Sequence, residues 1–297
     1  MAETNVESTF RGPGIAENDR GLSNSRPFVK WAGGKGQLIT ELLKKVPENL
    51  EVYREPFLGG GALFFALRRK GMKFRAFLSD TNPELINCYR VIKSSPGALI
   101  RQLRILRSQY RASANQEDYY YEIRDLKPIE EIQAAARFIF LNKTCYNGLY
   151  RENKAGKFNV PWGGYARPQI FEERNIFGVA RALRETDAKI QRLDFKEALK
   201  SANKGEVVYL DPPYYPLSKT ASFTDYTSRG FEESDHRDVA QFARDLKQKG
   251  CMVLVSNSET PFIRGIYAGF HIHRVDATRA ISCNGEGRTG FHELIIS

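Results

Sequence analysis

Strand-like and helix-like segments alternate along most of this 297-residue chain, and that alternation constrains the fold more than any other feature. Apolar residues recur at helical spacing over 38–46, before a strand-like run at 52–57. A second helix at 62–70 and a second strand at 74–79 follow. Such units build a mostly parallel sheet covered on both faces. The pattern therefore predicts an α/β fold with ligand sites at the carboxyl ends of the strands.

The alternation resumes in the second half of the chain. Pro83 suits the first position of a helix that continues to about residue 93. Ser234 fits the N-cap of a helix whose apolar positions extend to Leu246. Five further segments resemble strands: 189–193, 206–210, 251–256, 271–276 and 291–296.

The middle of the chain interrupts this alternation. Residues 96–141 predict helices with mixed faces, and 142–170 form a loop-like stretch rich in glycine and proline. The polar N-terminus is typical of a disordered tail. The expected parts are a tail at 1–26, a main domain formed by 27–93 and 186–297, and an inserted domain at 94–185.

Composition limits the partners of the chain. The net charge of +10 favours a polyanionic partner such as nucleic acid. No apolar run approaches the roughly 18 residues that span a bilayer, and the acidic, polar start is unlike a secretory signal. The four cysteines lack metal-ligand spacing. We therefore expect a cytoplasmic protein with no membrane segment and no metal.

A glycine-rich turn, Gly59-Gly60-Gly61, separates the first strand from its helix. Glycines let a ligand approach the main chain closely, and a helix N-terminus supplies unpaired N–H groups. Asp80 ends the next strand, where a carboxylate can accept hydrogen bonds from the two hydroxyls of a ribose. Turn and acid together indicate an adenosine-containing cofactor, although the dinucleotide spacing G-x-G-x-x-G is absent. The alternative is an ordinary tight turn of an α/β protein.

The segment Asp211-Pro212-Pro213-Tyr214 follows an apolar strand. Its prolines stiffen the loop and remove two N–H donors. Asp211 and a loop carbonyl can accept hydrogen bonds from the two hydrogens of an amino group on a base, which directs the nitrogen lone pair toward an electrophile, and Tyr214 can stack on the base. An ionised carboxylate also stabilises the positive charge that develops on that nitrogen. A stiff surface turn is the alternative, but the position after a buried strand favours a catalytic loop.

These motifs occur in an order that resembles the DNA adenine methyltransferases of the GATC-methylating type. The resemblance covers nearly all of residues 28–297 and is carried by 30–35, 55–61, 80–82, 146–151, 158–161, 211–214 and 282–285. It implies a Rossmann-like, S-adenosylmethionine-dependent methyltransferase sheet of seven strands. It also implies that a mainly helical DNA-recognition domain is inserted between the cofactor and catalytic motifs, the alpha-type order. The long N-terminal tail departs from the family pattern.

The resemblance also implies which residues form the sites. It assigns the 211–214 loop to a flipped adenine. It assigns to S-adenosylmethionine Trp31, Ala32, Gly33, Lys35, Phe57, Gly59, Gly60, Gly61, Asp80, Asp194 and Phe195. It assigns to DNA Lys30, Tyr146, Asn147, Leu149, Arg151, Pro161 and Tyr165.

The composition of the loop at 143–167 would allow it to bind nucleic acid, and the resemblance implies that the partner is duplex DNA. Five basic residues and five aromatic residues alternate there, and Glu152 is the only acid. Basic groups neutralise phosphates, and aromatic rings can wedge into a base step or replace a flipped base. Arg151 can contact guanine O6 and N7 together, and the resemblance gives it that role in GATC. A solvated loop with incidental aromatics is the alternative.

Taken together, the sequence predicts methyl transfer from S-adenosylmethionine to N6 of adenine in duplex DNA. N4-cytosine methylation is the alternative chemistry, but the cytosine enzymes typically carry serine where this chain has Asp211. A non-catalytic DNA-binding protein that retains the fold is the other alternative, and the intact 211–214 loop argues against it. We expect a monomer, with a dimer on DNA as the alternative. Restriction–modification and replication or repair both remain open as settings.

Overall fold

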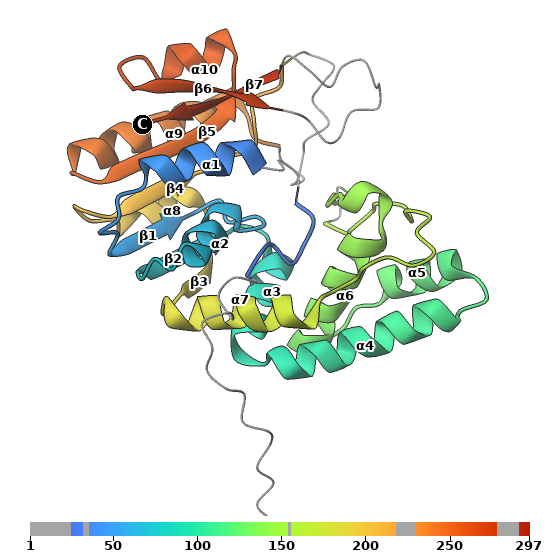
Figure 1. Cartoon of the computed structure of the whole chain (residues 1–297). Coiled ribbons are helices and arrows are strands. Elements are labelled where there is room, and N and C mark those ends of the chain that lie inside the picture. Colours follow the sequence, from blue (N-terminus) through green and yellow to red (C-terminus); the bar gives the residue numbers. More distant parts are fainter. Residues whose placement is uncertain (1–24, 32–35, 154–155, 218–229, 278–290) are drawn as a thin grey trace, which may run out of the picture.

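The computed structural model describes residues 25–31, 36–153, 156–217, 230–277 and 291–297. The described chain forms a sheet covered by helices, with a helical lobe beside it (Figure 1). Three predicted cofactor residues, Ala32, Gly33 and Lys35, lie outside the described residues, as do residues 1–24 of the expected tail and the motif at 282–285.

The sheet has seven strands in the order β3-β2-β1-β4-β5-β7-β6. The strands are β1 (Val52–Glu55), β2 (Arg75–Asp80), β3 (Lys189–Arg192), β4 (Val207–Leu210), β5 (Met252–Ser258), β6 (Ile272–Ala277) and β7 (Phe291–Ile296). The first five are parallel, and β7 runs antiparallel to both of its neighbours. The expected seven-stranded, mostly parallel methyltransferase-like sheet is therefore confirmed.

Helices cover both faces because alternate strand residues point to opposite sides. The helices that pack on the sheet are α1 (Gly36–Lys45), α2 (Ala62–Arg69), α3 (Pro83–Ser94), α7 (Glu173–Glu185), α8 (Phe195–Lys200), α9 (Glu233–Gln248) and α10 (Pro261–Ile266). Val207 and Tyr209 of β4 join the core beneath α1, α2 and α3, whereas Val208 and Leu210 join the core beneath α8, α9 and α10.

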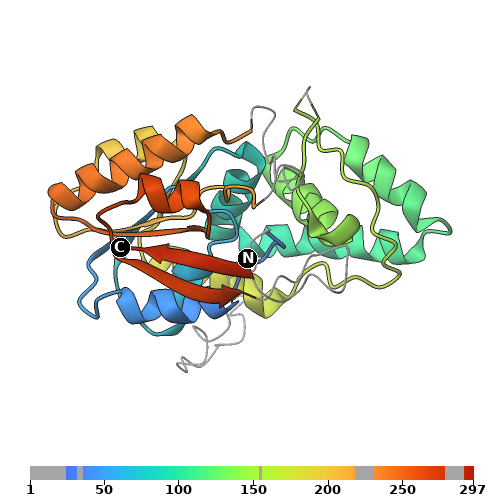
Figure 2. The same ribbon diagram turned by 90° about the horizontal axis from the view of Figure 1, so that it is seen from above.

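The helical lobe contains α4 (Pro96–Ala112), α5 (Gln116–Asp125) and α6 (Glu131–Thr144), followed by a short 3-10 helix at Tyr146–Gly148. Figure 2 shows this lobe beside the sheet layers rather than on top of them. Asn142 of α6 ties the two parts together. Its amide accepts from the Lys30 N–H (2.7 Å) and donates to the Lys30 carbonyl (2.8 Å).

Two ends of predicted segments differ from expectation. Helix α9 begins at Glu233, one residue before the predicted N-cap Ser234, so that prediction was wrong. The Asp235 carboxylate accepts from the N–H of Glu232, the true N-cap, at 2.9 Å, which favours the earlier start. Arg26, at the end of the expected tail, is also described, and its main chain pairs with the Asn175 side chain.

Candidate active site

The two strongest sequence motifs follow neighbouring strands. The glycine turn follows β1, and the 211–214 loop follows β4, which is paired with β1 in parallel through Tyr53 with Val207 and Arg54 with Val208. From β1 the chain proceeds outward to β2 and β3, and then returns to β4 and β5 on the other side. This is the topological switch point of the sheet, where open α/β sheets bind their ligands.

The glycine turn is held from two sides. The Gly59 N–H donates to Asp80 Oδ2 (3.0 Å), and its carbonyl accepts from the Tyr89 hydroxyl (3.0 Å). Gly59 and Gly61 have φ of 45° and 66°, in the left-handed region that favours glycine. A Cβ on Gly59 would lie only 2.7 Å from Trp31 Cδ1. The turn therefore requires glycine for its backbone and for the close approach of an aromatic ring.

Asp80 lies beside this turn at the end of β2. Its carboxylate accepts from the N–H groups of Gly59 and Asn82, at 3.0 and 2.9 Å. Burial raises the pKa of Asp80, while the amides of Asn82, Gly59 and Thr81 lower it. An ionised carboxylate has about four acceptor positions, so these three amides leave capacity for about one ribose hydroxyl. The geometry thus fits the expected adenosine-containing cofactor.

Glu55, the last residue of β1, is a buried acid to which the sequence assigned no separate role. It accepts from the Tyr53 hydroxyl (2.9 Å) and from the Phe64 N–H in the first turn of α2. Burial raises the pKa of Glu55 well above its ordinary value, and the nearby negative charge of Asp211 raises it further. An acid at the end of the strand, four residues before Gly59, was the only signal for it in the sequence.

Asp211 stands at the end of β4, and its carboxylate is fixed by β5. Ser256 Oγ donates to Asp211 Oδ1 at 2.5 Å and also contacts the Tyr209 hydroxyl at 3.0 Å. Since the serine proton is used on Asp211, the tyrosine is the donor in the second bond. Ser256 was not anticipated, because it lies in an ordinary apolar strand pattern 45 residues beyond Asp211.

Tyr214 is partly buried three residues later, and its hydroxyl donates to Glu293 Oε2 of β7 at 3.3 Å. Burial raises the pKa of Tyr214 well above its ordinary value, with the charges of Asp211 and Glu293 adding to the effect. The phenol is therefore neutral at physiological pH. Pro212 is buried and Pro213 partly buried, so the loop packs against the protein along its length.

The structure brings two further predicted cofactor residues together. The Phe57 ring stacks on the Phe195 ring, with centroids 5.2 Å apart and planes 27° apart. The Asp194 side chain accepts from the Lys196 N–H at 2.9 Å and caps α8, and its cofactor role stays a prediction.

Trp31 connects the cofactor turn to the loop at 143–167. Besides its contact with Gly59, its ring stacks on Tyr150 at 5.7 Å and 23°. Tyr150 directly precedes Arg151, the predicted guanine-reading residue. The predicted cofactor and DNA residues thus adjoin one another through two aromatic rings.

The predicted DNA residues lie along one loop and the adjoining irregular segment at 28–31. Lys30 Nζ lies 4.9 Å from the centre of the Tyr165 ring, and the Tyr146 N–H donates to the Pro161 carbonyl (2.9 Å). Asn147 is exposed with φ 53°, and Leu149 is partly buried. The Arg151 side chain is exposed and donates through Nε to Asn159 Oδ1 at 2.8 Å. Asn159 is a supporting residue that the sequence did not single out.

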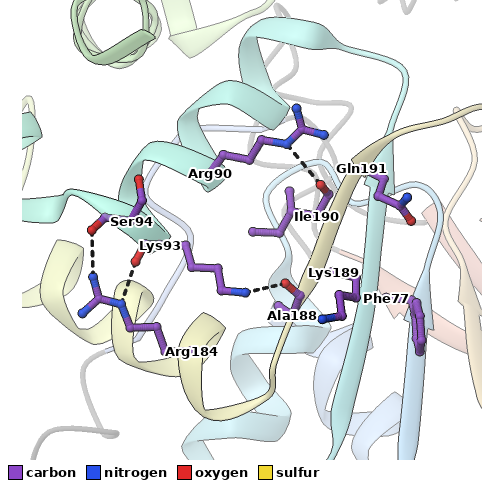
Figure 3. A pocket seen from close by; sticks show the side chains of 9 residues that line it. All are labelled: Phe77, Arg90, Lys93, Ser94, Arg184, Ala188, Lys189, Ile190 and Gln191. Atoms are coloured by element: carbon purple, nitrogen blue, oxygen red, sulfur yellow. Dashed lines mark hydrogen bonds between the residues drawn. The ribbon is translucent and has the colours of Figure 1, made fainter.

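A separate hollow of about 690 Å³ lies at the β3 edge of the sheet (Figure 3). Its basic side chains are engaged with main-chain carbonyls: Arg90 donates to Ile190, and Lys93 donates to Ala188. Covering the open carbonyls of an edge strand blocks pairing with another chain. The hollow contains none of the predicted site residues.

Within the described residues, no three His, Cys, Asp or Glu side chains gather in a way that could hold a metal ion. No helix of that part of the chain is long and apolar enough to cross a membrane.

Comparison with known proteins identifies what this site resembles. A family model described as D12 class N6 adenine-specific DNA methyltransferase matches residues 31–281. The chain is 41% identical over 285 residues to Type II methyltransferase M.MjaIII of Methanocaldococcus jannaschii, covering 91% of this chain and 98% of the relative. It is 35% identical over 277 residues to the DNA adenine methylase of Vibrio cholerae, covering 92% and 96%.

Proposed function

Because this chain belongs to the D12 class of N6 adenine-specific DNA methyltransferases, we propose that it methylates adenine within GATC with S-adenosylmethionine as the donor. The family establishes an adenine-specific DNA methyltransferase. The donor, the GATC site and the role of each residue are the proposed parts. When bound, S-adenosylmethionine supplies an electrophilic methyl group on a sulfonium.

The meeting of two motifs at the switch point is the observation that supports this proposal most directly. The glycine turn, with Asp80 beside it, provides main-chain and carboxylate contacts for the adenosine part of the donor. Asp211, on the adjacent strand, accepts a hydrogen bond from adenine N6 and stabilises the positive charge that develops there. Tyr214 stacks on the flipped base as a neutral phenol.

The loop at 143–167 selects the sequence. Arg151 is exposed, and Asn159 orients its guanidinium, which suits a bidentate contact with guanine. Lys30 lies over the Tyr165 ring of this loop, and Tyr146 is exposed on the loop, so both can complete the contact with the duplex. The excess of basic residues over the whole chain attracts the phosphate backbone.

Methylation of random-sequence plasmid DNA, followed by mapping of the modified bases, tests this proposal. We expect N6-methyladenine confined to GATC. Methylated cytosine, or methylated adenine spread over unrelated sequences, would contradict it.

The Asp211→Ala variant tests the assigned role of the carboxylate. We expect it to bind S-adenosylmethionine normally by calorimetry while the transfer rate falls by about 10²–10³-fold, the effect of losing one preorganised group that stabilises the transition state. Near-normal turnover would remove Asp211 from the reaction.

A further inference from the structure

Three consecutive residues at the end of β5 contact the catalytic loop at three different points. Ser256, Asn257 and Ser258 are buried, with at most 1% of each exposed. The regular pairing of β4 with β5 ends at Leu210 and Val255, so the loop beyond Leu210 has no strand partner there. Because Pro212 and Pro213 lack N–H groups, main-chain pairing cannot continue through them. Side chains of β5 take over at this position.

Each of the three side chains has a separate task. Ser256 donates to the Asp211 carboxylate at 2.5 Å. Asn257 Oδ1 accepts from the Tyr215 N–H (3.0 Å) and from the Ser258 N–H (2.9 Å). Ser258 Oγ donates to the Tyr215 carbonyl at 2.5 Å. The loop is therefore held at its acid and at both main-chain polar groups of Tyr215.

The opposite edge of β5 is paired with another strand, so the residues that make these contacts are themselves held in the sheet. Strand β7 pairs antiparallel with β5 along this segment, with Asn257 opposite Leu294 and Ser258 opposite Glu293. Glu293 in turn accepts from Tyr214. Asp211 at one end of the loop therefore contacts β5, and Tyr214 at the other end contacts β7, the strand paired with β5.

We propose that Ser256, Asn257 and Ser258 are positioning residues that hold the Asp211–Tyr215 loop in its reactive shape. This inference rests on the proposed function, in which Asp211 and Tyr214 contact the flipped adenine. Ser256 directs the Asp211 carboxylate, while Asn257 and Ser258 fix the peptide of Tyr215. A misplacement of about 1 Å in such a group costs about 10²-fold in rate, so the contacts matter for transfer even though none touches the base.

The test compares full-length variants by steady-state kinetics and by hydrogen exchange of the Tyr215 amide. Asn257→Leu removes the acceptor, and Asn257→Asp retains it. Ser258→Ala and Ser256→Ala each remove one donor. Thr186→Val is the matched control, because the Thr186 hydroxyl is also buried and donates to a main-chain carbonyl (2.8 Å), but far from the loop.

We expect Asn257→Leu and Ser258→Ala to lower kcat by about tenfold or more, the equivalent of one lost hydrogen bond, with the KM for S-adenosylmethionine within twofold of wild type. Asn257→Asp should restore protection of the Tyr215 amide relative to Asn257→Leu. Ser256→Ala should likewise lower kcat with little change in the KM for S-adenosylmethionine, since the Asp211 carboxylate has lost the donor that directs it.

Unchanged kcat and unchanged Tyr215 exchange in Asn257→Leu and Ser258→Ala would overturn the proposal. Equal losses in Thr186→Val would also overturn it, because they would reflect general stability. The exchange measurement needs no methyl transfer. A wild-type chain that fails to methylate adenine would therefore refute the proposed function, while the exchange data still decide whether these residues hold the loop.

Discussion

Single residues in this site are fixed by contacts that link distant parts of the chain. Gly59 is a clear case, since its N–H bonds to Asp80, its carbonyl to Tyr89, and the space above it holds Trp31. The glycine itself was predictable, because a turn between strand and helix calls for one. Its neighbours were not predictable from spacing, because they lie 21, 30 and 28 positions away along the chain.

Substitution of Gly59 by alanine should separate backbone strain from steric conflict. We expect Gly59→Ala to lower the free energy of unfolding by about 1–2 kcal/mol through its positive φ and to weaken binding of S-adenosylmethionine through conflict with Trp31. Gly269→Ala is the control, since Gly269 has φ 90° but open space at its Cβ position. Urea unfolding measures the stability of the two variants, and calorimetry measures their affinity for S-adenosylmethionine. Equal affinity for S-adenosylmethionine in the two variants would contradict the prediction.

His236 gives a pH dependence with a defined sign. Burial lowers its pKa to about 4 from an ordinary value of 6.5, although Asp235 and Glu233 oppose the shift. Between these values the unfolded chain binds more protons than the folded one, so stability is full above pH 6.5 and is lost as the pH falls toward 4. The total amounts to about 3 kcal/mol.

Urea unfolding at pH 4.5 and pH 7 should therefore show a smaller pH effect in His236→Leu than in the wild type. The same loss of stability in both proteins would exclude His236 as the cause. His236 packs against the Tyr215 ring, with the ring centroids 5.6 Å apart. On acidification, the segment at 211–215 should therefore lose its fixed conformation at a higher pH than the rest of the protein.

At the scale of helices and strands, most elements follow from local pattern. The strands at 52–57, 74–79 and 206–210 appear within two residues of their expected ends, because apolar runs bounded by turns leave few alternatives. The start of α9 was misplaced, since several polar residues there can cap a helix and only the folded loop decides which one does. Which strands pair could not be predicted from local pattern. The structure shows, for example, that a buried ion pair of Arg54 and Glu206 joins β1 to the start of β4.

The Arg54–Glu206 ion pair should have a strong influence on the stability of the protein, because it joins β1 to the start of β4. Both side chains are at most 8% exposed, so Arg54→Met leaves a buried carboxylate without its partner and should cost about 3–5 kcal/mol of stability. The double variant Arg54→Met/Glu206→Leu should recover much of that loss. Arg104→Met, which breaks an exposed pair with Glu173, should change the denaturation midpoint little. A double variant no more stable than Arg54→Met would contradict this account.

At the scale of the whole molecule, the sheet layer and the helical lobe share one apolar core, in which α3 packs on α6, and polar and aromatic contacts add to it. Asn142 binds the main chain of Lys30, and Trp31 stacks on Tyr150. The lobe and the cofactor turn are therefore joined along one short segment, 28–31. The extent of the recognition domain, expected at 94–185, stays a prediction, because α7 contacts both α3 of the sheet layer and α4 of the lobe.

The salt dependence and the base specificity of DNA binding test how the whole molecule contacts a duplex. The logarithm of the association constant should fall linearly with the logarithm of salt concentration, by about 0.9 for each phosphate neutralised. Arg151→Ala should keep that slope and lose discrimination at one guanine, worth about 1–3 kcal/mol. Filter binding on GATC and single-base variants checks it. A slope reduced by about one with uniform loss across sequences would make Arg151 a phosphate contact instead.

The sequence by itself determined the fold class, the family and the two central motifs, because alternating segments and short-range turn chemistry are encoded locally. Gly59, Asp80 and Asp211 could be identified in this way. Only the tertiary structure decided that β1 and β4 are neighbours, that Glu55 is buried near Asp211, and that Ser256 of β5 contacts Asp211. Such facts depend on which strands pair and on burial, and these arise from the packing of segments that lie far apart in the chain.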